Sequence, residues 1–113
     1  MKDTNEIKIV GRVSRIKTAF SAKGEEYARI TIAIEDPRNA DEEGEYNRYN
    51  IIYVSAFKRH VLNAIRRENI RSGNRILLKG YLSSYKVQVR GTEIYMLGVV
   101  AREVELVHKI EKQ

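Results

Sequence analysis

The segment from Tyr49 to Phe57 constrains the fold most, because it predicts a strand that is apolar on both faces. It is rich in β-branched and aromatic residues and contains neither Gly nor Pro, which favours extended backbone. Side chains along a strand point alternately to its two faces. The face suited to a core carries Ile52, Val54 and Ala56. The opposite face carries Tyr49, Ile51, Tyr53, Ser55 and Phe57.

The aromatic face of this strand has two interpretations. It can be covered by protein, as in a sheet that is packed on both sides, or it can form a platform on which flat ligands stack. The flanking residues Arg48, Lys58 and Arg59 are basic, and stacking beside Lys and Arg is how single-stranded nucleic acids are held. The strand alone does not decide between the two, because aromatic residues also favour strands for structural reasons.

The rest of the chain predicts four more strands and one short helix. Alternating apolar residues predict strands over 7–16, 27–35, 75–89 and 93–107. Helical spacing occurs at Val61, Leu62 and Ile65, and Gly73 is placed to close this helix with a left-handed residue. The predicted order is therefore three strands, one helix and two strands.

Internal glycines at 11, 80 and 98 indicate strands that bend strongly, as in a small closed barrel. Five strands with a helix between the third and the fourth is the layout of the OB-fold, an all-β barrel. In that fold the face near strands two and three binds oligonucleotides or oligosaccharides. The polar segment 17–26 is a predicted hairpin tip, where Phe20 either contacts a ligand or packs under the loop.

The charge of the chain favours a polyanionic partner. It has 21 Lys and Arg against 15 Asp and Glu, a formal net charge of +6. The acidic residues gather at predicted loops such as 41–45, whereas Glu68 is the only one between Arg48 and Arg90. A basic field therefore surrounds the aromatic strand.

Composition limits the class of protein. The 113 residues predict one domain over 1–113, with a core at about 5–107 and a short charged end at 108–113. The absence of Cys excludes disulfides and thiolate metal sites and fits a reducing compartment. No apolar run approaches the roughly 18 residues of a membrane span, and the N-terminus is not a signal peptide. We therefore expect a cytoplasmic protein that does not associate with membranes.

An enzyme is not expected. His60 and His108 are the only histidines, no cluster has metal-ligand spacing, and the acidic run 41–45 has the composition of a loop. The sequence thus indicates no catalytic residues, no metal and no cofactor.

Four segments carry a recognisable pattern by their order and spacing: 5–13, Gly24 with 28–34, 71–82 and 101–105. The first has an Asn, alternating aliphatic residues, and a Gly followed by Arg and an aliphatic residue. Together these segments resemble the bacterial single-stranded-DNA-binding proteins, and the first is similar to that family's opening strand. The resemblance covers nearly the whole chain, from residue 5 to about 107. It implies an OB-fold and binding of single-stranded DNA without sequence preference.

The resemblance also implies which side chains stack bases. The family uses aromatic residues of its third strand and of the hairpin between its fourth and fifth strands. Tyr49, Tyr53 and Phe57 fall on the former, and Tyr81 and Tyr85 fall on or beside the latter. The phosphate-contacting candidates are basic residues near these aromatic groups: Arg12, Arg29, Arg48, Lys58, Arg59, Lys79 and Lys86.

The chain departs from the family pattern in two respects. It has no Trp, which the family often uses for stacking, so each Tyr should stack somewhat more weakly. Its end at 108–113 lacks the family's acidic tip, so recruitment of partners through a tail is not expected. These departures fit a short accessory protein of replication, recombination, repair or mobile-element transfer, or a relative of the primosomal B proteins.

The expected assembly is a homo-oligomer, a dimer or a tetramer. Members of the family pair through their first strand, where Val10 leaves an apolar residue on the outer face. The alternatives to DNA binding are binding of single-stranded RNA, because stacking does not read the sugar, and a protein-interaction module that buries its aromatic residues in a partner.

Overall fold

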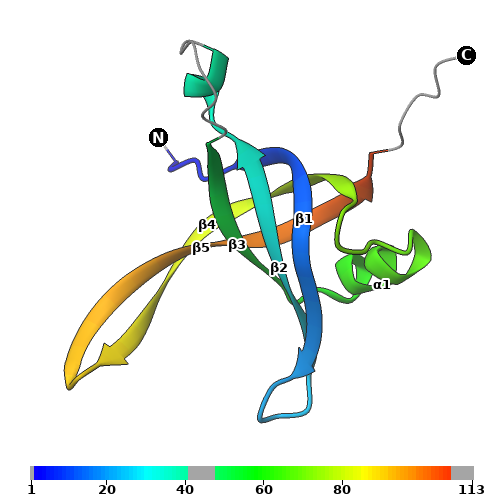
Figure 1. The fold of residues 1–113 in the computed structure, drawn as a ribbon. Coiled ribbons are helices and arrows are strands. Elements are labelled where there is room, and N and C mark those ends of the chain that lie inside the picture. The colour runs from blue at the N-terminus through cyan, green and yellow to red at the C-terminus, as the bar shows by residue number, and fades with distance from the viewer. Residues whose placement is uncertain (1, 41–47, 108–113) are drawn as a thin grey trace, which may run out of the picture.

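Five strands close into a barrel in a computed structural model that describes residues 2–40 and 48–107 (Figure 1). Their order around the barrel is β1–β2–β3–β5–β4. The strands are β1 (Ile7–Phe20), β2 (Glu26–Glu35), β3 (Tyr49–Ala56), β4 (Arg75–Val89) and β5 (Thr92–Leu106). A helix, α1 (Arg59–Arg67), joins β3 to β4, and a 3₁₀ turn, η1 (Pro37–Ala40), follows β2. This confirms the predicted OB-fold. The predicted acidic loop 41–45 and the charged end at 108–113 lie outside the described residues.

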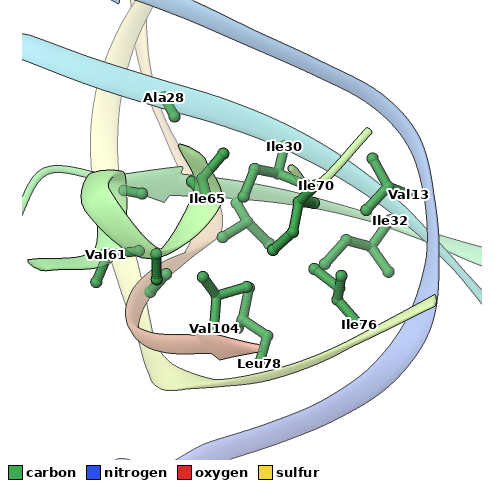
Figure 2. Close-up of a cluster of buried hydrophobic side chains, with 14 of the residues drawn as sticks. Val13, Ala28, Ile30, Ile32, Val61, Ile65, Ile70, Ile76, Leu78 and Val104 are labelled. Atoms are coloured by element: carbon green, nitrogen blue, oxygen red, sulfur yellow. The ribbon is translucent and has the colours of Figure 1, made fainter. Parts of the chain in front are cut away.

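Alternation along the strands fills the interior of the barrel. On β2 the side chains of Ala28, Ile30 and Ile32 are almost inaccessible to solvent, and Ile30 lies opposite the buried Val54 of β3. Ile76 of β4 is also buried among them. Figure 2 shows how the side chains of several strands meet in this core. Burying an aliphatic side chain contributes roughly 1.5–3 kcal/mol, so the inward sets of these strands drive closure of the barrel.

The helix α1 closes one end of the barrel. Its apolar side contributes Val61, Leu62 and Ile65 to the core, as the helical spacing predicts (Figure 2). The helix ends earlier than predicted, because Asn69 and not Gly73 is the left-handed residue that follows it, with φ of 52°. Asn tolerates this conformation better than most residues.

Gly73 instead shapes the next turn, with φ of 94°. Its N–H donates to the carbonyl of Val13 (2.7 Å), and the Val13 N–H donates to the carbonyl of Asn74 (2.8 Å). The Ser72 hydroxyl donates to the carbonyl of Ser14 (3.0 Å). The turn after α1 therefore holds the middle of β1.

A bulge at Ser14 changes the direction of the following side chains of β1. Val13 pairs with Ile32 of β2, but the next pair joins Arg15 to Thr31, so one residue of β1 is left over. Strict alternation would turn Arg15 toward the interior. The bulge places it on the outer face instead. The strand also continues to Phe20, four residues beyond the predicted end at 16.

The hairpin of β4 and β5 projects from the barrel as a two-stranded arm (Figure 1). Its strands pair up to Val89 and Thr92 at the tip. At its base, a Cβ on Gly80 would lie 2.0 Å from the carbonyl oxygen of Val100, so only Gly permits this close approach. A register shift lies at the same place, between Lys79 and Gly80. The predicted bend at Gly80 is therefore a bulge at the base of the arm.

Candidate nucleic-acid interface

The outer face of β3 carries exposed aromatic rings. The side chains of Tyr53 and of Phe57, which directly follows the strand, are 66% and 56% exposed, whereas Val54 and Ala56 between them are buried. Within one chain, the aromatic face is therefore an open platform and is not covered by another layer of the fold. The Phe57 ring packs against Tyr27 of β2, with ring centroids 6.1 Å apart.

Tyr53 and Phe57 line an open groove of about 740 Å³. Tyr85 of the β4–β5 arm, which is 49% exposed, lines the same groove. Gly98 of β5 also lines the groove, next to the Tyr85 ring and the backbone of Tyr53. A Cβ there would lie 3.5 Å from Cε1 of Tyr85 and 3.6 Å from the carbonyl oxygen of Tyr53. Three aromatic side chains thus surround a hollow that is open to flat ligands.

Three cations line the groove beside the rings. They are Arg15 and Lys17 of β1 and Arg29 of β2. Lys17 lies directly opposite Arg29, and like charges in that position destabilise a sheet. No carboxylate within residues 2–40 and 48–107 forms an ion pair with any of the three. Such an arrangement costs stability in the free protein and favours an anionic ligand.

The groove is hereafter defined by six residues: Arg15, Lys17, Arg29, Tyr53, Phe57 and Tyr85. Four of them, Arg29 and the three aromatic residues, are among the residues predicted from the sequence. Arg15 was missed because period-two alternation turns it inward unless the bulge at Ser14 is known, and Lys17 because it was assigned to the predicted hairpin tip 17–26. The sequence does contain one signal that could have located them. Ile16 is an apolar residue between two cations, so its side chain is expected to face the core and those of Arg15 and Lys17 to face outward.

Two predicted stacking residues lie outside the groove. Tyr49 is exposed at the other end of β3, opposite Glu35 of β2. Tyr81 is half-buried, and the guanidinium of Arg102 lies over its ring at 4.7 Å from the centroid. A base reaching Tyr81 would therefore meet a cation that already covers the ring.

Two predicted phosphate-contacting arginines have partners within the protein. Arg12 donates to the carbonyl of Gly73 (3.1 Å). Arg59 donates to the carboxylate of Glu26 (3.0 Å), which Arg66 also contacts. The pKa of Glu26 is lowered mainly by the hydrogen bond from Arg66; burial opposes this shift, and the hydrogen bond from Arg59 adds a smaller lowering effect. The cluster links β2 to α1.

The remaining predicted cations are spread over other surfaces. Arg48 precedes β3, where its backbone N–H donates to the side chain of Asn39 (3.1 Å). Lys86 lies on the face of the arm turned away from Tyr85, with its Nζ 5.6 Å from the ring centroid of Tyr95. Lys58 and Lys79 line a separate hollow. The structure thus brings only Arg29, of the seven predicted cations, into the groove.

Residues 2–40 and 48–107 contain no group of three or more His, Asp or Glu side chains that could hold a metal ion. No helix in these ranges is both long enough and apolar enough to cross a membrane.

A small barrel with an open groove of aromatic rings and cations defines an OB-fold module suited to flat, anionic ligands. The chain belongs to the single-strand binding protein family, whose model matches residues 4–107. This confirms the resemblance found in the sequence. No curated protein sequence matches the chain.

Solved structures that share this fold include two single-strand binding proteins. One is a Plasmodium falciparum single-strand binding protein in complex with single-stranded DNA, with a TM-score of 0.72 and 16% identity over 95% of this chain and 96% of that chain. The other is Rim1, a mitochondrial single-stranded-DNA-binding protein of S. cerevisiae, with a TM-score of 0.69 and 22% identity over 94% and 97% of the two chains. At these identities the likeness establishes the fold.

Proposed function

We propose that this protein binds single-stranded DNA without sequence preference and protects it. The observation that carries the proposal is the groove, where exposed aromatic rings line one hollow together with three cations that have no ion-pair partner among residues 2–40 and 48–107. Membership of the single-strand binding protein family supports the same activity.

Bases stack on Tyr53, Phe57 and Tyr85. Stacking on an aromatic side chain contributes about 1–3 kcal/mol per base and tolerates any sequence, because every base has a π-face. A duplex keeps these faces inside its own stack, so the groove selects unpaired nucleotides. Gly98, which lines the groove beside the Tyr85 ring, has no side chain that would take up space in it.

Phosphates are neutralised by Arg15, Lys17 and Arg29. Each neutralised phosphate releases counterions, so affinity falls with salt by a slope of roughly 0.7 per contact for single strands. Bound phosphates also relieve the repulsion between Lys17 and Arg29, which face each other across β1 and β2. The mechanism is passive, without a catalytic step, a metal or a cofactor.

We also propose that the protein forms a homo-oligomer whose subunits contact each other through β1. Val10 is 46% exposed on the outer face of β1, opposite Leu77 of β4. This exposed apolar side chain supports the outer face of β1 as the subunit contact. As a single-domain cytoplasmic protein it serves an accessory role in replication, recombination, repair or mobile-element transfer.

Titration of the intrinsic tyrosine fluorescence tests the proposed activity. Oligo-dT, duplex DNA and single-stranded RNA are added at two salt concentrations. We expect strong quenching by oligo-dT, weaker binding of the duplex and a clear dependence on salt. Duplex binding equal to that of oligo-dT would contradict the proposal, and tighter binding of RNA would reassign the ligand.

A further inference from the structure

Tyr27 of β2 contacts two side chains of the groove but is not itself one of the residues that line it. Its ring centroid lies 6.1 Å from that of Phe57, with the two ring planes 38° apart. The guanidinium of Arg29 lies over the same ring, 5.6 Å from the centroid. Tyr27 is half-buried, whereas Phe57 and Arg29 are exposed. One partly buried ring therefore contacts both a proposed stacking group and a proposed phosphate contact.

Alternation along β2 brings these three side chains together. Tyr27 and Arg29 are two residues apart, so both lie on the outer face of the strand, and Ala28 between them is fully buried. Ala28 lies opposite Ala56, the last residue of β3, and Phe57 follows directly. Phe57 therefore leaves β3 beside Tyr27, where the two rings meet.

The Tyr27 ring orients a cation without neutralising it. On the preceding residue of β2, the Glu26 carboxylate accepts hydrogen bonds from Arg59 (3.0 Å) and Arg66, and its negative charge offsets theirs. The face of an aromatic ring attracts a cation but carries no net charge. Arg29 thus has a fixed partner and keeps its full positive charge for an anion.

We propose that Tyr27 is a positioning residue, which holds Phe57 and Arg29 in the free protein as they are needed for base stacking and phosphate contact. The inference rests on the proposed function and deepens it by assigning a residue that acts through two others. Ordering a flexible side chain such as that of Arg on binding weakens a complex by roughly 2- to 12-fold. A ring that orders these side chains beforehand removes this cost.

The variant Tyr27→Leu tests the proposal by fluorescence anisotropy of labelled oligo-dT at several salt concentrations. We expect the affinity to fall roughly three- to tenfold. The slope of log affinity against log salt should become less steep by about 0.7, although no charge is removed, because Arg29 no longer holds its phosphate. A purely structural role would leave this slope unchanged, and that result would overturn the inference. Tyr27→Phe keeps the ring and should bind like the unsubstituted protein.

A double-mutant cycle at low salt distinguishes positioning from direct contact with DNA. In the background Arg29→Gln/Phe57→Ala, Tyr27→Leu should change the affinity by less than about twofold, because the two side chains through which it acts are absent. A loss in this background as large as in the unsubstituted protein would overturn the inference, since Tyr27 would then contact the DNA itself or only support the fold.

The variant Tyr95→Leu is the matched control. Nζ of Lys86 also lies 5.6 Å from the centroid of this ring, on the face of the arm turned away from Tyr85. The control should leave the affinity within about twofold and the salt slope unchanged. A loss equal to that of Tyr27→Leu would overturn the inference, because the effect would then not depend on contact with the groove.

One measurement does not require Tyr27→Leu to fold. In the unsubstituted protein, the ring current of Tyr27 should shift the nuclear magnetic resonance signal of the Arg29 Nε–H, and the shift should persist in the oligo-dT complex. Loss of the shift on binding would overturn the inference, because Arg29 would then leave the ring to meet the phosphate. If the unsubstituted protein does not bind oligo-dT at any salt concentration, the proposed function itself fails.

Discussion

Lys17 of β1 lies directly opposite Arg29 of β2, and both side chains line the groove. On the proposed function this pair trades stability for ligand binding, since cross-strand pairs of opposite charge are favourable and like charges are not. Substitution of Lys17 should therefore change the free energy of unfolding and the affinity for DNA in opposite senses.

Reversing the charge at Lys17 should stabilise the fold and weaken binding. In Lys17→Glu a carboxylate faces Arg29, so we expect the free energy of unfolding to rise by about 0.2–1 kcal/mol. Affinity for oligo-dT should fall, with a salt slope less steep by about 1.4, because one cation is lost and the other is paired. Chemical denaturation and fluorescence titration measure the two effects. Unchanged affinity would show that Lys17 and Arg29 do not contact the DNA. Lys17→Gln should give a salt slope between those of Lys17→Glu and the unsubstituted protein.

Removing an aromatic ring from the groove should lower affinity without unfolding the barrel. Tyr53→Ala loses a stacking surface worth about 1–3 kcal/mol, which corresponds to a roughly 5- to 150-fold weaker oligo-dT complex. Because the ring is 66% exposed, thermal stability should change little. Ile51→Ala, on the same face but outside the groove, is the matched control.

The combined variant Tyr53→Ala/Phe57→Ala separates DNA binding from a protein-interaction role. Loss of oligonucleotide binding with the oligomer intact supports the groove as a nucleic-acid site. Dissociation of the oligomer with DNA affinity retained would instead make these rings a subunit contact.

Filling the space at Gly98 should block the groove. Gly98→Val places branched carbons in the groove, beside the Tyr85 ring and the Tyr53 carbonyl, while Val itself favours a strand. We expect a large loss of oligo-dT affinity with a near-native circular dichroism spectrum. Gly98→Ala is the control, because its Cβ makes only ordinary contacts of 3.5 and 3.6 Å. Unchanged oligo-dT affinity of Gly98→Val would show that no base occupies the part of the groove beside Gly98.

Acid should weaken the connection between β2 and β3 through Asp36. Its pKa is lowered to about 2, first by the hydrogen bonds from the Arg38 side chain and then by that from the Arg38 backbone N–H. A lowered pKa in the folded state stabilises the protein above the ordinary value of 3.8, and this stabilisation is lost as the pH falls toward 2.

Denaturation of Asp36→Asn at several pH values checks this. The variant should be less stable than the unsubstituted protein at neutral pH, and the difference should shrink between about pH 4 and pH 2. A difference that stays constant over this interval would show that the carboxylate charge is not what stabilises the turn. Glu35→Gln, at the exposed neighbouring position, is the control.

The barrel could be predicted from the sequence because apolar and polar residues alternate regularly along the strands, and the inward residues of neighbouring strands are both buried. Ile30 and Val54 show this, since each lies on the predicted inward face and they are opposite each other in the barrel. The exposed face of β3 follows from the same alternation, so Tyr53 and Phe57 could be placed in advance. The family resemblance contributed Tyr85, whose groove-facing position depends on the arm.

The other features of the site depend on backbone geometry that residue types do not reveal. The bulge at Ser14 turns Arg15 and Lys17 outward, and no single residue type marks a bulge of this kind. The helix end was misplaced because Asn69 takes the left-handed conformation that Gly73 was expected to supply. The predicted cation Arg59 is paired because β2 brings Glu26 close to α1, a contact between residues distant in the sequence.

The turn after α1 has a consequence for how such a surface can change in evolution. Hydrogen bonds from Gly73 and Ser72 to Val13 and Ser14 hold the leftover residue of β1 in place. If that residue were instead taken up into regular pairing, without the bulge, Arg15 and Lys17 would turn inward and Ile16 outward, with every amino acid unaltered. The charge on this side of the groove is thus set by one irregularity of the backbone, which the turn after α1 holds in place.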